Sequence, residues 1–116
     1  MKMIIAIVQP IWLTNVVAAL EAIEGFPGMS ISSTRGFGHS KSFEGVYPYG
    51  LKLEDYVNYN EMLRFEIVVR DDMVDDVVET VERAVRMGSR HNGMIYVLPV
   101  EGVVRLQTGK INDGAL

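Results

Sequence analysis

Hydrophobic and polar positions alternate along the first third of the chain in the order strand, helix, strand. Met3 to Val8 is a short apolar run rich in isoleucine and valine, which is typical of a strand covered on both faces. From Leu13 to Ile23 the apolar positions recur at helical spacing, with Thr14 as the expected cap and Gly25 as the stop. Residues 29–34 then alternate with a period of two, as a half-buried strand does.

The second half of the chain repeats this order. Leu63 to Val69 alternates between apolar and polar positions and predicts a strand. The helix that follows begins after the acidic residues Asp71 and Asp72 and is expected to end at Gly88. Its apolar stripe consists of five valines: Val74, Val77, Val78, Val81 and Val85. After an Asn-Gly turn at residues 92–93, residues 94–98 predict another strand, and residues 103–106 a short fifth one.

Two split βαβ units in a chain of 116 residues predict an α+β fold. We expect a ferredoxin-like βαββαβ sandwich, in which an antiparallel sheet carries two helices on one face. The length fits a single domain, residues 1–116. Because the first strand is apolar almost throughout, the other sheet face also needs a cover, so we expect an oligomer.

Residues 39–60 show no sustained period, and a loop of this length is uncommon unless it is functional or disordered. The segment holds most of the aromatic residues that lie outside the predicted elements: Phe43, Tyr47, Tyr49, Tyr56 and Tyr59. Aromatic side chains on an exposed segment are what a protein partner would bury. We therefore expect a partner-binding loop here, with tyrosines packed back onto the domain as the alternative.

Composition and charge narrow the class of protein. The chain has no cysteine, which excludes disulfides, thiolate metal sites and cysteine nucleophiles. Its formal net charge of −4 argues against binding to nucleic acid. No apolar run approaches the ~20 residues that a membrane-spanning helix needs. Since no signal peptide is apparent either, a cytoplasmic protein without direct membrane insertion is expected.

The sequence contains no recognisable catalytic constellation, so we expect no enzyme activity. Gly36-Phe37-Gly38 begins a G-x-G-x-x-G pattern, but Lys41 takes the sixth position and no helix follows. The only histidines, His39 and His91, have no carboxylates at ligand spacing, so no metal site is expected. Glycine-bearing turns near the arginines at 90 and 105 would suit a phosphate, although ordinary turns look the same.

Two C-terminal stretches resemble the PII nitrogen-regulatory signalling family. Residues 87–97 read MGSRHNGMIYV and residues 103–109 read VVRLQTG, where the family has T-G-K-I-G-D-G-K-I-F-V and V-x-R-I-R-T-G. With the Gly-Phe-Gly end of the second strand, the resemblance covers nearly the whole chain except the long loop. It implies a homotrimer that binds an adenine nucleotide (ATP, ADP or AMP) in clefts between subunits. It also implies regulation of a membrane transporter or a metabolic enzyme through the loop.

The resemblance also implies which residues line the nucleotide cleft. They are Ile7, Ser30, Gly36, Gly38, His39, Ser40, Glu66, Val68, Arg90, His91, Asn92, Gly93, Arg105 and Gln107. This chain has Met62 and Met94 where the family has lysine, and Gln107 where it has arginine. His39 and Ser40 replace an Arg-Gln pair. Because charged contacts to phosphate are lost, we expect a weakened ATP site, and we do not expect magnesium-assisted binding of 2-oxoglutarate.

The family's modified tyrosine follows an acidic residue, as Tyr56 follows Asp55 here, so Tyr56 is the candidate modification site. Other functions stay open. The missing cations favour a trimeric interaction module that has lost nucleotide binding. A metal-binding trimer like the cation-tolerance proteins, or a small ferredoxin-like enzyme, would need side chains that the sequence does not supply in one place.

Overall fold

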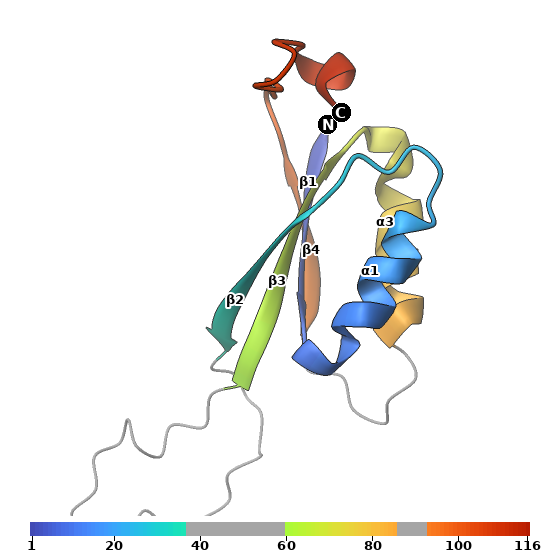
Figure 1. Cartoon of the computed structure of the whole chain (residues 1–116), viewed down its shortest axis with the longest axis vertical. Coiled ribbons are helices and arrows are strands. Elements are labelled where there is room, and N and C mark those ends of the chain that lie inside the picture. Colours follow the sequence, from blue (N-terminus) through green and yellow to red (C-terminus); the bar gives the residue numbers. More distant parts are fainter. Residues whose placement is uncertain (37–59, 86–92) are drawn as a thin grey trace, which may run out of the picture.

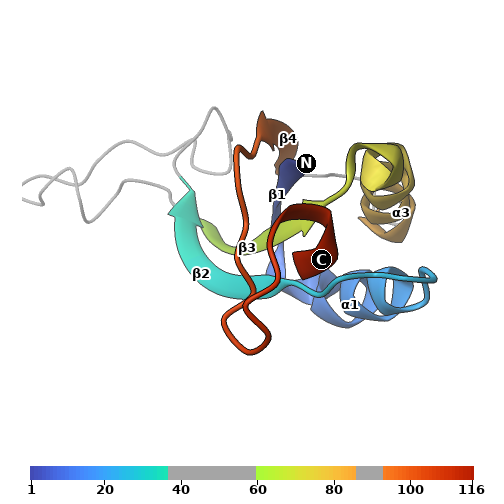
Figure 2. The same cartoon turned by 90° about the horizontal axis from the view of Figure 1, so that it is seen from above.

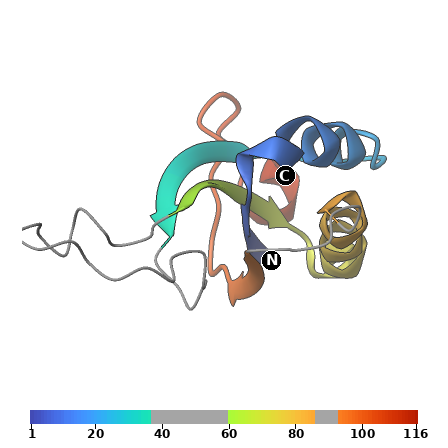
Figure 3. The same cartoon turned by 90° about the horizontal axis from the view of Figure 1, so that it is seen from below.

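The computed structural model describes residues 1–36, 60–85 and 93–116 (Figure 1). Its elements are, in order, β1 (Lys2–Val8), η1 (Pro10–Trp12), α1 (Leu13–Glu21), β2 (Ser30–Gly36), β3 (Asn60–Val69), η2 (Asp71–Met73), α3 (Val74–Val85), β4 (Met94–Pro99) and η3 (Asn112–Ala115). The strands form one antiparallel sheet in the order β2-β3-β1-β4. Both helices cover the same face of this sheet (Figures 2 and 3). The predicted ferredoxin-like α+β fold is confirmed.

The hydrophobic core lies between the sheet and the two helices. Every second residue of the central strand β1 points toward the helices, because successive side chains of a strand point to opposite faces. The core residues are Ile4, Ala6, Val8, Val16, Leu20, Phe65, Ile67, Val69, Val77 and Val81. The remaining valines of the predicted stripe on α3 pack against this core. The valine stripe therefore fixes the side of α3 that meets the sheet.

The predicted cap of α1 is wrong. The helix begins at Leu13 and its N-cap is Trp12, which makes no side-chain capping bond, so Thr14 lies inside the helix. The reason is the turn η1, in which Pro10 supplies a helical φ and the Trp12 N–H donates to the Gln9 carbonyl at 3.0 Å. The chain therefore enters α1 already wound and needs no hydroxyl cap.

Two predictions about strands are also wrong. Residues 103–106 add no strand to the sheet, since among them only Val104 forms a bridge, with Ile111, inside a separate hairpin. Residues 30–33 of β2 are exposed rather than half-buried, because β2 is an edge strand that runs beyond the cover of the helices (Figure 2). The helical period is thus a better guide to burial in this chain than the alternation in its edge strand.

The strand β3 begins earlier than the pattern predicted. The register of β2 with β3 continues to Gly36 opposite Asn60, so the two strands form a ribbon beyond the end of β1. Asn60, the last residue of the predicted loop at 39–60, is therefore in a strand, and the rest of that loop lies outside the described residues. Gly88, the predicted end of α3, also lies outside them.

Asp71 makes a contact that the sequence pattern does not indicate. Its carboxylate oxygen Oδ1 lies 3.0 Å from the N-terminal ammonium group of Met1. The hydrogen bond and the positive charge of this ammonium group lower the pKa of Asp71. The Val100 N–H donates to the Met1 carbonyl at 3.1 Å. The start of β1 is thus held from two sides, by the segment after β3 and by the segment after β4.

We expect Asp71→Asn to lower the melting temperature slightly at neutral pH and not at all in strong acid. A carboxylate whose pKa is lowered by folding stabilises the protein above its ordinary pKa of about 4 and loses this effect as the pH falls through the lowered value. The expected change in melting temperature is small because the Asp71 side chain is 68% exposed. Thermal unfolding at about pH 7 and about pH 2 measures it, with Asp75→Asn as the control. An equal deficit at both pH values would contradict this explanation.

Candidate functional site

The face of the sheet that carries no helix, here called the open face, holds the predicted nucleotide residues of the strands. The register places Ile7 of β1 between Arg64 of β3 and Met94 of β4. Residues that oppose each other in neighbouring strands share a face. The open face consists of Met3, Ile5, Ile7, Ser30, Ser32, Thr34, Met62, Arg64, Glu66, Val68, Met94, Tyr96 and Leu98. It includes four predicted site residues: Ile7, Ser30, Glu66 and Val68.

An ion pair lies in the middle of the open face. The Nε–H of Arg64 donates to Oε1 of Glu66 at 2.9 Å, and both side chains are half-buried. The two residues are two positions apart in β3, so they lie on the same face. The two charges neutralise each other, and the ion pair holds the carboxylate of the predicted site residue Glu66 toward Arg64 of the same strand. Among the described residues, only one of its two carboxylate oxygens is engaged.

Among the predicted site residues that the structure describes, Gly93, which immediately precedes β4, is the most tightly constrained. Its φ is +143°, a backbone conformation that L side chains rarely adopt. A Cβ at this position would overlap the carbonyl oxygen of Ile7 and would lie 3.7 Å from Cε of Met62. Gly93 is therefore required for the start of β4 to lie directly against the end of β1.

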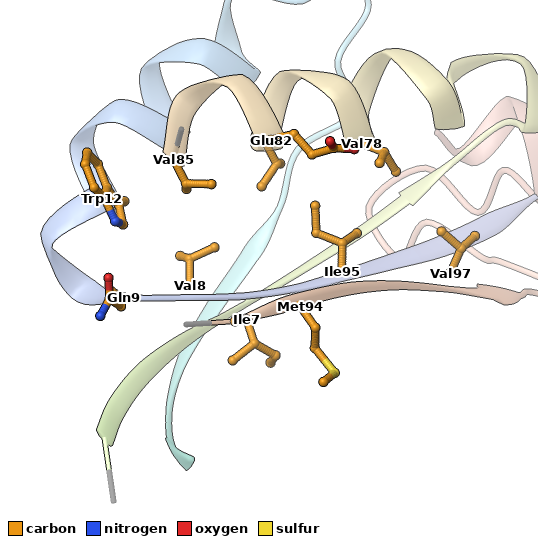
Figure 4. A pocket seen from close by; sticks show the side chains of 12 residues that line it. Ile7, Val8, Gln9, Trp12, Val78, Glu82, Val85, Met94, Ile95 and Val97 are labelled. Carbon is orange, nitrogen blue, oxygen red and sulfur yellow. The ribbon is translucent and has the colours of Figure 1, made fainter. Parts of the chain in front are cut away.

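The surroundings of Gly93 are apolar. Met62 of β3 is buried and Met94 of β4 is exposed, so two thioether side chains flank the point where β1 ends and β4 begins. Figure 4 shows Ile7 and Met94 pointing to the open face, away from α3. Thioethers accept hydrogen bonds only weakly and carry no charge. This end of the sheet accordingly presents no cationic side chain from positions 62 and 94.

Arg105 and Gln107 lie in a hairpin of residues 103–111, here called the C-terminal hairpin. The Arg105 N–H donates to the Lys110 carbonyl at 2.9 Å, and the Gly109 N–H donates to the Arg105 carbonyl at 2.8 Å. Gly109 permits the tight turn with a φ of +70°. The tip projects into solvent, where Leu106 is 95% exposed. The hairpin thus carries a cationic residue beyond the C-terminal end of β4.

The predicted site residues fall at opposite ends of β4. Gly93 precedes the strand and the C-terminal hairpin follows it (Figure 1). The strand has six residues, which span about 20 Å at ~3.3 Å per residue. Gly93 and Arg105 of one chain are therefore too far apart to contact the same phosphate. Gly36 lies at the Gly93 end, because its partner Asn60 is the first residue of β3.

A pocket of about 530 Å³ lies on the other side of the sheet, between α3 and the edge strand β4 (Figure 4). Its lining is mostly apolar and includes Val78 and Val85 of α3 and Ile95 of β4. Trp12 also lines it, and the indole N–H of this residue is buried with no acceptor among the described residues. Ile7 and Gly93, which the family resemblance places in the nucleotide cleft, also line this pocket. The valines of α3 that line it were interpreted from the sequence as core residues.

Some predicted site residues lie outside the described residues, so their positions stay predictions. For the nucleotide cleft these are Gly38, His39, Ser40, Arg90, His91 and Asn92. For the partner-binding loop they are Phe43, Tyr47, Tyr49, Tyr56 and Tyr59. Within residues 1–36, 60–85 and 93–116, no group of three or more potential ligands is placed to hold a metal ion. No helix in that part of the chain is long and apolar enough to cross a membrane.

Comparison with known proteins gives matches over the whole chain. A family model described as nitrogen regulatory protein P-II matches residues 1–110. The chain is 36% identical to nitrogen regulatory protein P-II of Klebsiella oxytoca and 40% identical to that of Microchaete diplosiphon, in each case over 116 residues and 100% of both chains. The crystal structure of Arabidopsis thaliana PII bound to citrate matches with a TM-score of 0.78 and 33% identity, covering 99% of this chain and 91% of the other.

Proposed function

The chain belongs to the P-II family of nitrogen regulatory proteins, and from this premise we propose that it is a homotrimer that binds an adenine nucleotide between its subunits. We also propose that it is cytoplasmic and has no enzyme activity. The bound nucleotide biases the segment at residues 39–60, which contacts a membrane transporter or a metabolic enzyme. Such coupling requires that the nucleotide binds two arrangements of the protein with different affinities. Regulation of a partner through signalling is the role that the family assignment supports.

The separation of Gly93 from Arg105 is the observation that best supports a nucleotide cleft between subunits. One copy cannot bring both residues to the same phosphate, because they lie at opposite ends of β4. If neighbouring copies are arranged head to tail around an axis, the Gly93 end of one meets the hairpin of the next. Each site then contains glycine and sheet residues from one copy and Arg105 from another.

The open face supports assembly of several copies. Its residues on β1 and β4 are almost all apolar, and Met94, Tyr96 and Leu98 of β4 are exposed in the single chain, at 64%, 37% and 37%. An extended apolar sheet face is covered in a stable protein, by helices or by another sheet. Copies that turn their open faces toward a common axis cover them. The apolar composition of β1 on both faces, noted in the sequence, has the same explanation.

The methionines favour a nucleotide with few phosphates. Met62 and Met94 stand where the family resemblance implies lysine, and Gln107 stands where it implies arginine. Each charge-assisted contact to a phosphate contributes roughly 1.5–3 kcal/mol. Losing several of them lowers the affinity for ATP by orders of magnitude, while Arg105 remains for a single phosphate. We therefore propose AMP or ADP, in preference to ATP, as the effector.

Calorimetric titration with AMP, ADP and ATP, each with and without magnesium and 2-oxoglutarate, tests this function. We expect saturable binding of one nucleotide per subunit, tightest for AMP or ADP, with little effect of 2-oxoglutarate. Tighter binding of ATP than of AMP would contradict the proposed preference. Citrate, to which the Arabidopsis relative is bound, is a useful competitor because it is a small anion with several charges.

A trimeric interaction module without nucleotide binding is the second candidate function. The apolar side chains at positions 62 and 94 favour it, since both are placed beside Gly93 and neither attracts phosphate. The same titrations separate the two candidates. Absence of binding across the whole nucleotide series would support the interaction module and exclude the sensor.

A further inference from the structure

We propose that the C-terminal turn η3 is a positioning element for Arg105 and thereby sets the affinity of the site for the phosphate of its nucleotide. The inference rests on the proposed function, because it assumes that Arg105 meets a phosphate. It goes further in assigning a role to residues 112–115, through the main-chain carbonyl of Ala115. In this arrangement the Ala115 carbonyl holds Arg105, and the guanidinium group of Arg105 meets the phosphate.

The contact between Arg105 and η3 is short and its acceptor is fixed. The Nε–H of Arg105 donates to the Ala115 carbonyl at 2.6 Å. Ala115 is 1% exposed, so the acceptor belongs to a buried, well-packed residue. The main chain of Arg105 is held as well, by Lys110 and Gly109 of the hairpin. Both ends of this long side chain are therefore restrained before any ligand arrives.

The hydrogen bond occupies only one edge of the guanidinium group. A guanidinium has five N–H donors in a rigid, planar fork. With Nε engaged by Ala115, the edge formed by the two terminal NH₂ groups has no acceptor among the described residues. That edge matches two oxygens of one phosphate. An arginine fixed in this way loses little rotamer freedom on binding, which raises its affinity for the phosphate.

Asn112 fixes the turn against the base of the hairpin. Its φ is +53°, and its N–H donates to the Val103 carbonyl at 2.8 Å. Its side-chain Oδ1 accepts a longer hydrogen bond, 3.4 Å, from the Val103 N–H. Figure 2 shows the C-terminal turn folded back beside the hairpin. The position of the Ala115 carbonyl thus depends on the backbone conformation of Asn112, which is remote from the proposed ligand.

The test compares two substitutions at Asn112. Asn112→Pro removes the N–H and forces a negative φ, so it displaces η3 and the Ala115 carbonyl. Asn112→Gly keeps the N–H, tolerates the positive φ and removes only the long side-chain hydrogen bond from Val103, so it is the matched control. Affinities for AMP and adenosine are measured by calorimetry, and Arg105→Gln gives the value for complete loss of the guanidinium. The Nε–H signal of Arg105 in ¹⁵N NMR reports directly whether the hydrogen bond to Ala115 persists.

We expect Asn112→Pro to lower the affinity for AMP about tenfold, which corresponds to the cost of ordering one long, flexible side chain on binding. Adenosine affinity stays unchanged, because adenosine has no phosphate, and Asn112→Gly behaves like the unaltered protein. The Nε–H signal disappears or exchanges rapidly in Asn112→Pro alone. A loss of adenosine and AMP binding to the same extent would show a merely structural role and overturn the inference. Unchanged AMP binding by Asn112→Pro would overturn it too.

Failure of the proposed function has a different signature. In that case the unaltered protein itself binds neither AMP, ADP nor ATP, and the inference falls with it. Failure of the inference alone leaves the unaltered protein binding AMP and shows only in the comparison of the two Asn112 variants.

Discussion

Gly93→Ala is expected to destabilise the protein and to abolish nucleotide binding. A side chain at a φ of +143° costs about 1–3 kcal/mol in backbone strain. The new Cβ also overlaps the Ile7 carbonyl oxygen, and such overpacking costs typically another 1–3 kcal/mol. The overlap is with backbone, which cannot rotate away as a flexible side chain does. Relief requires the start of β4 to move from the end of β1, which displaces Met94 on the open face.

A second glycine separates these two contributions. Gly28 has a φ of +114°, and nothing lies within 4 Å of a Cβ built on it. Gly28→Ala therefore reports the backbone strain alone, and we expect it to leave nucleotide binding intact. Urea unfolding of both variants gives the free energies of unfolding, and calorimetry gives the affinities. Equal losses of stability in the two variants would mean that the contact of Gly93 with Ile7 is unimportant.

Leu98→Glu is expected to convert the assembled protein into monomers. Leu98 lies on the open face opposite Met3 of β1. When copies turn these faces toward one another, each glutamate becomes a charge buried without a partner, which costs several kcal/mol per copy. The symmetry of the assembly repeats this cost in every subunit. Light scattering coupled to size-exclusion chromatography should show a fall in mass from three chains to one.

Leu13 is a matched control for this substitution. It is 39% exposed, whereas Leu98 is 37% exposed, and it lies at the start of α1 on the helical side of the molecule. Leu13→Glu should leave the oligomer intact, since the outward side of the helices has no part in the proposed assembly. A trimer that survives Leu98→Glu would refute the placement of the open face at the centre. Circular dichroism verifies that both variants remain folded.

The parts of the fold that depend on short-range periodicity were predictable. The valines of α3 are spaced so that one face of the helix is apolar, and Val77 and Val81 are buried on that face. The strand β1 is apolar on both faces, and the sequence correctly indicated a strand there; its central place in the sheet is a finding of the structure. In both cases the pattern within one element determines what that element can pack against.

The errors concern positions whose structure is decided by residues outside the element in which the pattern was seen. Thr14 has the right chemistry for a cap, but Pro10 had already wound the preceding turn. Val104 has the chemistry of a strand residue, yet its hydrogen-bonding neighbours are in the returning arm of its own hairpin. Local propensity cannot distinguish these alternatives, because the competing partners lie elsewhere.

The candidate site was predictable as a set of residues but not as an arrangement. The family resemblance implied that Gly93 and Arg105 belong to the same site. Only the structure shows that, within one chain, they lie at opposite ends of β4. The hydrogen bond from Arg105 to Ala115 joins residues ten positions apart through a main-chain carbonyl. Because every residue has such a carbonyl, the sequence does not indicate which one accepts the bond. Side-chain identity therefore predicts the chemistry of the site and not its geometry.

The central position of β1 has a consequence for how the protein is made. β1 is synthesised before both strands with which it pairs: Ile5 lies opposite Glu66 of β3 and Tyr96 of β4. Until those strands have been synthesised, an apolar segment with high β propensity has no partner for its backbone. Such non-local pairing slows folding. The nascent chain is therefore most prone to aggregation before β4 closes the sheet, and slower translation after β1 would prolong that interval.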